Sequence, residues 1–528
     1  MTVAPELASP PPEQPRTPRG RTLRASAAGV RDLAGVGRGS RLGLLGAGFS
    51  AVANFALVLV VTHGFGRRDA GLFFSVTAAF LVVEMLCRLG TDVGSVYFIA
   101  RLRSLGDSGQ IAAHLRVALQ PVVALCGAMV AAGLLSSGWL ARNVLGAEAG
   151  RMMQVLVIAL PFAVVYDICL AATRGFGTVT ASTLLERLLR PGMQLMLLGV
   201  VVAFGGSTTV LAVAWSVPYL VLLPAALAVL AHLVRAEGIA QLHGEPGIAR
   251  TFWSFAAPRS VTGLAQALLQ RLDVVLVAVI LRPSDAAIYA AASRFLVLGQ
   301  LGNQALAAPV EPRLSGLLAR EDVNGAKDVY RMSTAWLVGI SWPVFLLASI
   351  YAPTVMRVFG PGYSSGWPVV LTLCLCMLVA SGVGLVDVVL IMAGRTTWNL
   401  ANTLIALVVN VGLDLILLPS VGLVGAAIGW GAAVLLTNLI PLAQIHHLMK
   451  LHPFGRSVGI SVVSALAAFG AVAGGVRLAL GPGFISLAAA GVIAVTLYAF
   501  LLFREREELG LHLLLGRLVN LPAGARSS

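Results

Sequence analysis

Long apolar segments follow one another along most of the chain, and short polar connections separate them. One helix needs about 20 apolar residues to cross a bilayer. Runs of about this length lie at 43–62, 71–98, 116–137, 152–173, 183–203, 208–233, 254–281, 285–311, 332–356, 367–393, 397–418, 422–446, 457–478 and 483–503. The pattern therefore predicts an all-α integral membrane protein with about 14 transmembrane helices.

Two short sequences occur twice along this row of predicted helices. The segment 69–75 (DAGLFFS) resembles 285–291 (DAAIYAA), and 192–198 (GMQLMLL) resembles 412–418 (GLDLILL). The two offsets are nearly equal, about 216 and about 220 residues, and each spans six helices. We therefore expect two six-helix lobes that are parallel repeats, with the substrate site between them and two further helices appended.

The polar segments complete the predicted organisation. Residues 1–40 are rich in proline and arginine, which is typical of a disordered basic tail. The positive-inside rule places such a tail in the cytoplasm, and the charges of the loops and of both tails together favour this orientation by about three to one. We therefore expect a protein of the cell membrane with both termini in the cytoplasm. The predicted division is 41–233 for the first lobe, 234–253 for a cytoplasmic loop, 254–448 for the second lobe, 449–503 for the appended helices and 504–528 for a cytoplasmic tail.

The composition excludes most soluble classes of protein. Hydrophobic residues make up 58% of the 528 residues and charged residues only 11%, against about 25% charged residues in soluble domains. The net charge of +14 comes from arginines scattered between apolar runs, without a basic patch that contains aromatic residues, so we expect no nucleic-acid partner. The five cysteines lie in apolar runs without zinc-ligand spacing. We expect no metal site and no cofactor.

Arginines inside apolar runs are the most informative polar residues. Arg271 and Asp273 lie in the predicted seventh helix, and Arg294 lies in the eighth. A charge at such depth costs about 2.5–3.5 kcal/mol on insertion scales, so it usually faces a cavity or a partner. At about 1.5 Å per residue, both arginines lie about 14 Å below the predicted outer surface. Either they bind or gate a cargo, or they form ion pairs with acids that link neighbouring helices.

A second set of charges lies on the predicted second helix. Glu84, Arg88 and Asp92 are spaced by four residues and would form a continuous charged stripe on one helix face. The stripe is either a self-satisfied ladder that faces the other lobe or a wall of the cavity. In the second case its acids would help couple transport to protons, sodium or the membrane potential. Asp387, a lone acid of the predicted tenth helix, is a candidate for the same role, and Asp167 is another lone acid.

Two further groups of polar residues have more ordinary explanations. One helical turn separates Asn410 from Asp414, and with Asn402 nearby we favour hydrogen bonds between helices. Charged residues also flank the predicted cytoplasmic connection between the fourth and fifth helices: Arg174, Glu186, Arg187 and Arg190. Snorkelling to the membrane surface explains most such residues. The alternative is a cytoplasmic gate for the cargo.

Three motifs resemble those of a known family. They are Arg271-Leu-Asp273 followed by Tyr289-Ala-Ala-Ala-Ser-Arg294, then Phe359-Gly-Pro-Gly-Tyr363, and then Asn410-Val-Gly-Leu-Asp414-Leu-Ile-Leu-Leu-Pro419 followed by Gly422-Leu-Val-Gly-Ala-Ala427. With these motifs, residues 40–503 resemble the polysaccharide-export flippases of the multidrug/oligosaccharidyl-lipid/polysaccharide (MOP) superfamily. The resemblance implies two six-helix lobes around a central cavity that opens alternately to the two membrane faces. It also implies a cargo, a polyprenyl-diphosphate-linked sugar, that moves from the inner to the outer leaflet.

The implied cargo suggests a function for the intramembrane charges. Planar guanidinium groups match phosphate oxygens well, so we expect Arg271 and Arg294 to contact the diphosphate, with Arg88 and Asp273 as further cavity contacts. The expected partners are the lipid-linked oligosaccharide, membrane lipid, and glycosyltransferases or a polymerase of the same pathway. We expect the protein itself to be a monomer.

Other functions stay open at the level of the sequence. A cation-coupled exporter of small drugs would share the fold, but its cavity would favour acidic and aromatic residues over arginines. A lipid II flippase belongs to the same superfamily, and no motif separates its cargo from other lipid-linked sugars. An integral-membrane glycosyltransferase or polymerase would typically display a sizeable outer loop with catalytic acids or histidines, whereas the predicted outer loops are short and poor in both.

Overall fold

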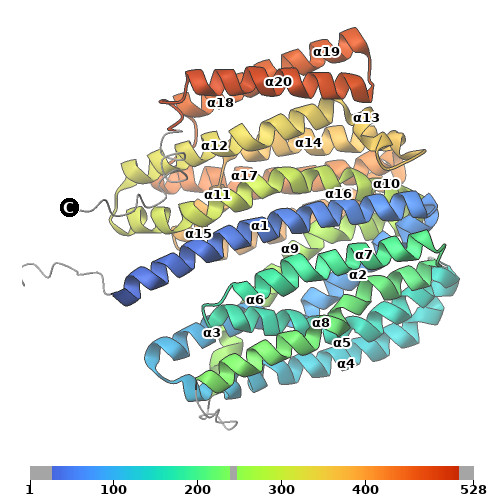
Figure 1. The fold of residues 1–528 in the computed structure, drawn as a ribbon, viewed down its shortest axis with the longest axis vertical. Coiled ribbons are helices and arrows are strands. Elements are labelled where there is room, and N and C mark those ends of the chain that lie inside the picture. Colours follow the sequence, from blue (N-terminus) through green and yellow to red (C-terminus); the bar gives the residue numbers. More distant parts are fainter. Residues whose placement is uncertain (1–26, 145, 238–246, 511–528) are drawn as a thin grey trace, which may run out of the picture.

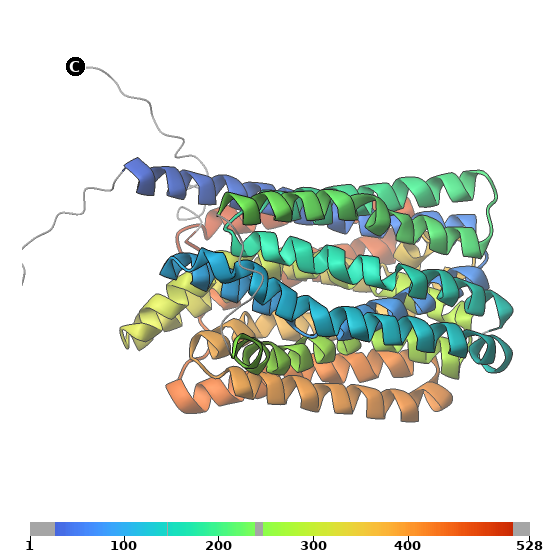
Figure 2. The same cartoon turned by 90° about the horizontal axis from the view of Figure 1, so that it is seen from below.

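The computed structural model describes residues 27–144, 146–237 and 247–510. Within these ranges the chain is nearly all helical, and long helices lie side by side with roughly parallel axes (Figure 1, Figure 2). Twelve helical segments of this part of the chain are long and apolar enough to cross a membrane. The protein is therefore an integral, multi-pass membrane protein of the all-α class.

The first half of the chain runs from α1 to α8. Its elements are α1 (Ala27–Gly64), α2 (Arg67–Arg88), α3 (Thr91–Leu105), η1 (Ser108–Gln110), α4 (Ile111–Asn143), α5 (Ala147–Gly175), α6 (Thr180–Ser182), η2 (Thr183–Leu189), α7 (Arg190–Ala203) and α8 (Thr208–Ala236). Helix α1 covers 27–40, the last part of the segment predicted to be a disordered tail. The last proline of that segment is Pro18, and no later residue of it lacks a backbone N–H for the helix. The earlier part of the predicted tail lies outside the described residues.

The second half begins with α9. Its elements are α9 (Ile248–Ile280), α10 (Pro283–Ala292), α11 (Arg294–Ala319), α12 (Val323–Ile350), α13 (Ala352–Arg357), η3 (Tyr363–Gly366), α14 (Trp367–Val383), α15 (Val386–Met392), α16 (Thr396–Val421) and α17 (Leu423–Met449). The appended part consists of α18 (Arg456–Ala465), η4 (Leu466–Val472), α19 (Ala473–Leu480) and α20 (Phe484–Arg504). It packs against α12 at one edge of the molecule (Figure 1). Residues 238–246 of the predicted loop between the halves and 511–528 of the predicted C-terminal tail lie outside the described residues.

Two of the predicted spans are helical but are not among the twelve. The span predicted at 183–203 corresponds to η2 and α7, which include Glu186, Arg187 and Arg190. The span predicted at 285–311 corresponds to α10 and α11, which an interruption at Ser293 separates. These segments are less apolar than the others because they line a polar cavity, described below.

Helix interruptions occur at positions where the predicted spans are continuous. The second span breaks into α2 and α3 at Leu89 and Gly90, whose φ angles are 51° and 72°. A Cβ atom on Gly90 would come within 2.4 Å of the carbonyl oxygen of Ala256 on α9. The break therefore lets α2 and α3 follow the surface of α9, and the expected continuous stripe over Glu84, Arg88 and Asp92 is interrupted.

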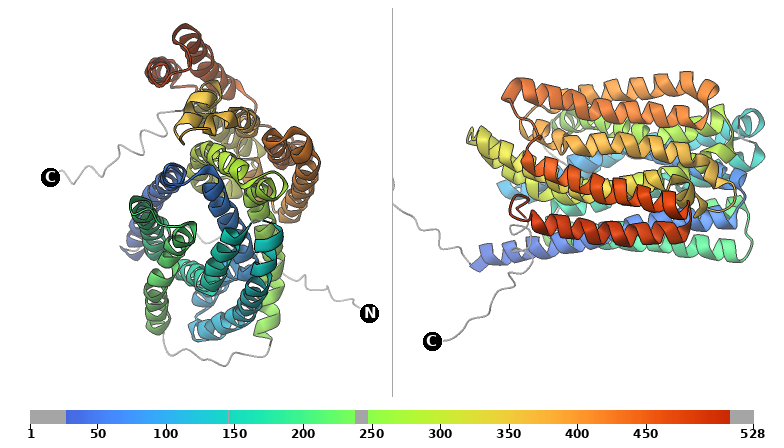
Figure 3. Two further views of the ribbon diagram at one scale, coloured as in Figure 1. Left: turned by 90° about the vertical axis from the view of Figure 1, so that its right-hand side faces the viewer. Right: turned by 90° about the horizontal axis from the view of Figure 1, so that it is seen from above.

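The two halves meet at many points along α2, which packs against α9 and α10 (Figure 3, left). At the predicted outer end the approach is closest, because a Cβ atom on Gly71 would lie 1.6 Å from the carbonyl oxygen of Pro283. An aromatic cluster lies at the same end: Phe55 on α1, Phe295 on α11, and Phe359 before η3, with neighbouring ring centroids 5.6–6.0 Å apart. The Arg67 side chain donates to the backbone oxygen of Gly362 at 3.3 Å. Together these contacts close the predicted outer end of the molecule.

Candidate functional site

A cavity of about 480 Å³ lies between the two halves of the chain. Helices α1, α2, α7 and α8, with η2, line it from the first half, and α9, α10, α11 and α17 line it from the second half. The lining residues of α1 run from Ala47 to Val58 and do not reach its last turns before Gly64. The cavity thus stops short of the last turns of α1.

Four arginines line this cavity: Arg187, Arg190, Arg271 and Arg294. Two acids, Glu186 and Asp273, line it with them. Even with both acids ionised, the wall carries two more positive than negative charges. Such a wall attracts anions and repels cations.

Arg271 and Arg294 were both predicted to reach a central cavity, and the structure places both in its wall. Arg271 lies on α9, and Arg294 begins α11 directly after the interruption at Ser293. The Nε of Arg294 donates to the backbone oxygen of Ala290 at 3.1 Å. Within the described part of the chain, no carboxylate oxygen lies within 4.0 Å of either guanidinium group. Both cations are therefore available to an anion in the cavity.

Asp273 lies two residues from Arg271 but has different partners. Its side chain is 3% exposed and accepts a hydrogen bond from the Tyr289 hydroxyl at 2.6 Å. The Asn410 amide fits its surroundings when its oxygen accepts from the backbone N–H of Trp430 and its nitrogen donates to Asp273, both at 3.2 Å. The alternative in which Arg271 pairs with Asp273 is thus not what the structure shows.

Asn410 and Asp414 differ although both are fully buried on α16. Asn410 links α16 to α9 and α17, as expected for a residue that joins helices. Both carboxylate oxygens of Asp414 lack a hydrogen-bond partner in the described structure, so the expected hydrogen bond of Asp414 is absent. Asn402, expected to lie near them, instead exchanges two hydrogen bonds with Gln444 on α17, at 2.8 and 3.0 Å.

The acids and Arg88 of the second span form a cluster with Asp167 that does not line the cavity. Arg88 binds Glu84 through two hydrogen bonds of 2.5 and 2.8 Å and also binds Asp167 of α5. Its distance to Asp92 is 3.9 Å. None of these four residues is among those lining the cavity, so the prediction that Arg88, Glu84 and Asp92 form its wall is wrong. The self-satisfied alternative fits Glu84 and Arg88, with Asp167 as the partner that the sequence could not indicate.

Asp387 also lies away from the cavity. It is exposed on α15, a short helix that follows α14 after the interruption at Gly384 and Leu385. The structure therefore does not bring it together with the other candidate coupling acids.

Three of the four predicted gate residues line the cavity. Glu186 and Arg187 belong to η2, a π-helical turn, and Arg190 follows it directly. The Nη1 of Arg190 lies 3.3 Å from Asp167 Oδ1, and its guanidinium group lies 5.4 Å from the centre of the Tyr219 ring. Arg187 donates to the backbone oxygen of Gly43 at 3.1 Å. These residues therefore belong to the same site as Arg271 and Arg294.

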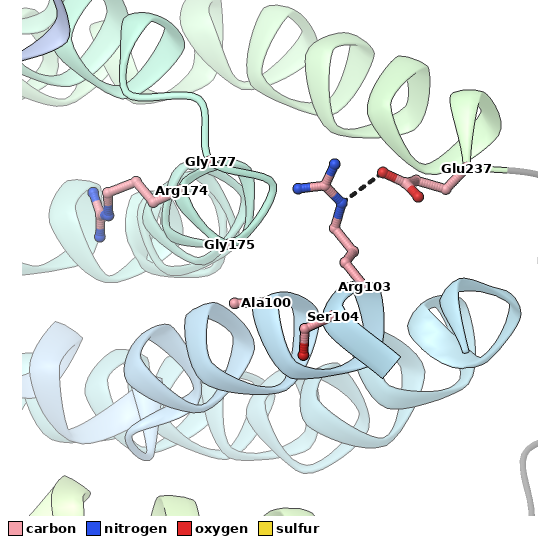
Figure 4. A pocket seen from close by; sticks show the side chains of 7 residues that line it. All are labelled: Ala100, Arg103, Ser104, Arg174, Gly175, Gly177 and Glu237. Atoms are coloured by element: carbon pink, nitrogen blue, oxygen red, sulfur yellow. Dashed lines mark hydrogen bonds and ion pairs between the residues drawn. The ribbon is translucent and has the colours of Figure 1, made fainter. Parts of the chain in front are cut away.

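Arg174, the fourth gate residue, borders a second hollow, of about 530 Å³, at the inner ends of α3, α5 and α8. It points away from this hollow and pairs with Glu186 at 3.0 Å (Figure 4). On the other side, Glu237 accepts hydrogen bonds from Arg103 at 2.6 Å and from Ser108 at 2.9 Å. These two bonds hold the pKa of Glu237 below its ordinary value. Because Arg103 and Arg174 are both paired with acids, we interpret this hollow as a contact between helix ends and not as a binding site.

Uncharged polar residues complete the cavity wall and were not among the predicted site residues. They include Asn54 on α1, Thr77 on α2, Gln194 on α7, Tyr219 on α8, Gln270 on α9, and Gln300 and Gln304 on α11. The signal that could have found the asparagine and the glutamines is the presence of amide side chains within apolar runs, at helical spacing in the case of 300 and 304.

Comparisons with known proteins agree with this architecture. Residues 110–371 match the sequence model of a family described as polysaccharide biosynthesis protein. A comparison with curated proteins finds no match. Among solved structures, the lipid II flippase MurJ in an inward closed conformation has a TM-score of 0.69 at 11% identity, over 91% of this chain and 100% of that chain.

Two other solved structures share the fold. A multidrug resistance MATE family transporter of the MOP superfamily, in an inward-facing conformation, has a TM-score of 0.63 at 17% identity, over 78% of this chain and 98% of that chain. A MOP superfamily transporter from Pyrococcus furiosus has a TM-score of 0.56 at 17% identity, over 79% of this chain and 97% of that chain. At such identities the likeness shows the fold.

The helical fold with a cavity between its two halves is the architecture of multi-pass membrane transporters. Residues 110–371 are thus similar to a polysaccharide biosynthesis family, and the fold of the chain is similar to the folds of a MOP superfamily transporter and of a lipid II flippase.

Proposed function

We propose that this protein is a flippase that moves a polyprenyl-diphosphate-linked oligosaccharide from the inner to the outer leaflet of the cell membrane by alternating access. Both termini lie in the cytoplasm, as the positive-inside rule requires. Glycosyltransferases of the same pathway would assemble the cargo on the inner face, and the delivered unit would enter a cell-surface polysaccharide.

One observation carries the proposal: Arg271 and Arg294 line a cavity between the halves, and neither has a carboxylate within 4.0 Å among the described residues. A diphosphate supplies the anion that these two cations lack, and each guanidinium group can bind two phosphate oxygens. The sugars can hydrogen-bond the amide side chains of the wall, such as Gln270, Gln300 and Gln304. The prenyl chain can stay in the lipid, because only the diphosphate and the sugars need a polar path.

The charge of the cavity also discriminates between the candidate cargoes. An exporter of cationic drugs would have to hold a cation against four arginines and at most two ionised acids. Lipid II has a polyprenyl diphosphate of the same chemistry, so the cavity does not separate it from other lipid-linked sugars. The diphosphate is therefore the part of the cargo that the site supports best.

The proposal is tested by the leaflet location of the lipid-linked sugar in cells. Arg271→Ala and Arg294→Ala should each reach normal abundance yet reduce flipping by at least about tenfold, since each removes a desolvated charge pair with the diphosphate. Arg271→Lys should restore only part of the activity, because a point charge replaces a bidentate donor. Arg259→Ala is the matched control, because Arg259 lies on the same helix outside the cavity lining.

Normal flipping by Arg271→Ala at wild-type abundance would refute a cargo role for this residue. Resistance to cationic drugs that depends on the protein, without any change in leaflet distribution, would instead favour the drug exporter.

A further inference from the structure

Arg190 belongs to two environments at once. Its side chain is 23% exposed and lines the cavity, and its guanidinium group also contacts Asp167, whose side chain is 6% exposed. Asp167 is the sole carboxylate within 4.0 Å of Arg190 in residues 27–144, 146–237 and 247–510. Arg190 thus stands between a buried acid on one side and the candidate cargo space on the other.

Asp167 is not essential for compensating Arg88. Arg88 keeps two hydrogen bonds to Glu84, at 2.5 and 2.8 Å, and a third acid, Asp92, lies at 3.9 Å. Arg190 has no second acid within 4.0 Å in the described residues. The acid of α5 is therefore the one that matters for the charge of Arg190.

The contact between Arg190 and Asp167 has the geometry of a bond that can be exchanged. At 3.3 Å between Nη1 and Oδ1 it is longer than the roughly 2.7–2.9 Å of a strong charge-assisted hydrogen bond. It is also a single contact, so the other donors of the guanidinium group remain available on the cavity side. The Tyr219 ring, 5.4 Å from the guanidinium carbon, supports the cation from one side.

We propose that Asp167 is the resident counter-anion of Arg190, which holds this arginine while the cavity is empty and gives it up to the phosphate of the cargo. This inference rests on the proposed function, since it needs an anionic cargo in the cavity. A carrier must change its conformation both with and without cargo. If Arg190 is paired with phosphate in the loaded carrier and with Asp167 in the empty carrier, its charge is compensated in both. The desolvation free energy of the conformational change is then lower than for an arginine that is unpaired after each release.

The proposal separates binding from turnover. Removing the acid leaves Arg190 free for the diphosphate, so binding should become tighter. Return of the empty carrier should become slower, because Arg190 then lacks a counter-charge. A merely structural role for Asp167 would weaken binding and turnover together.

The experiment measures binding of farnesyl diphosphate to the purified full chain in detergent by calorimetry, beside flipping in cells. Asp167→Asn should tighten binding by about tenfold, which is the size expected for one desolvated charge pair, and it should slow flipping. In an Arg190→Gln background the same substitution should leave the affinity unchanged. Asp167→Glu should restore both values towards wild type, because it returns the carboxylate.

Glu84→Gln is the matched control, since it removes an acid from the same cluster that Arg190 does not contact. It should leave the affinity within about twofold, while thermal midpoints report any loss of folding. Equal tightening by Asp167→Asn with and without Arg190 would overturn the proposal, because the acid would then act by general repulsion. Unchanged or weaker binding in Asp167→Asn would also overturn it.

Binding of farnesyl diphosphate by the wild-type protein distinguishes a failure of the counter-anion role from a failure of the proposed function. If farnesyl diphosphate binds and Arg271→Ala weakens it, but Asp167→Asn has no effect, only the counter-anion role fails. If wild type does not bind farnesyl diphosphate at all, the proposed function fails and the role of Asp167 fails with it.

Discussion

The arginines of the helices around the cavity differ in how their charge is compensated. Arg88 has acids on several sides, Arg190 shares one acid with it, and Arg271 and Arg294 have none within 4.0 Å in the described structure. An ion removed from water costs several kcal/mol unless a partner repays it. Arg88 is therefore suited to hold helices together, whereas Arg271 and Arg294 need water or an anion.

Substituting these residues should separate stability from transport. Arg88→Met leaves the buried Glu84 without a cation and Asp167 with Arg190 alone, which should cost about 3–5 kcal/mol of stability. Arg271→Met removes a cation without stranding an acid and should leave stability nearly unchanged. Thermal midpoints of the purified proteins in detergent check this, and equal loss in both variants would contradict it.

At this scale the sequence indicates where charges lie but not what they contact. Hydropathy alone identified Arg271 and Arg294, because each interrupts an apolar run. The same signal pointed to Arg88, which instead pairs with Glu84 and Asp167 and does not line the cavity. The difference arises from Asp167, which is 79 residues away in the chain and comes to Arg88 only through packing of α5 on α2. No local pattern contains that contact.

The interruptions of the helices determine which side chains reach the cavity. The π-helical turn η2 contains Glu186 and Arg187 and directly precedes Arg190, and the interruption at Ser293 places Arg294 at the start of α11. A π-helical turn shifts the following residues relative to a regular α-helix and occurs frequently at functional sites. Irregular backbone at membrane depth is tolerated where it lines a cavity. These two elements satisfy that condition.

The break between α2 and α3 can be tested with a pair of glycines. Gly90 and Gly106 both have positive φ angles, 72° and 80°, so alanine at either position costs about 1–2 kcal/mol. A Cβ atom on Gly90 would also lie 2.4 Å from the Ala256 backbone oxygen, whereas no atom of the described residues lies within 4 Å of one on Gly106. Gly90→Ala should therefore lose about 1–3 kcal/mol more than Gly106→Ala.

Thermal or denaturant unfolding of the two variants measures this difference. Similar losses would mean that α9 can move away from the break without cost. The sequence could predict the helices, since run length decides which segments cross the membrane. It could not predict the break at Leu89 and Gly90, because contact with α9 imposes a backbone conformation that leucine rarely adopts.

At the scale of the molecule, the two halves form a cavity that is closed at one end. The predicted repeat of six helices placed the substrate site between halves, and the cavity lies there. The closed end depends on contacts between halves: Gly71 of α2 against Pro283 of α10, and Phe55 of α1 against Phe295 and Phe359. Transport by alternating access requires these contacts to separate when the cavity opens outward.

A single methyl group should force that separation. In Gly71→Ala the new Cβ would lie 1.6 Å from the Pro283 backbone oxygen, and no side-chain movement relieves a clash with backbone. We expect α2 and α10 to move apart and the cavity to become accessible from outside. A cysteine in place of Gln270, which lines the cavity, should then react several-fold faster with an impermeant thiol reagent added to intact cells.

The matched control is Gly127→Ala, since a Cβ atom at Gly127 on α4 would have no neighbour within 4 Å in the part of the chain that the structure describes. The parent without the Gln270→Cys change reports any labelling of the five native cysteines, four of which are buried. If Gly71→Ala lowers abundance, Phe55→Ala combined with Phe359→Ala removes the rings of the closure without a clash and should have the same effect. Unchanged labelling in both variants, at normal abundance, would show that the outer end is held by other contacts and that these residues do not form its gate.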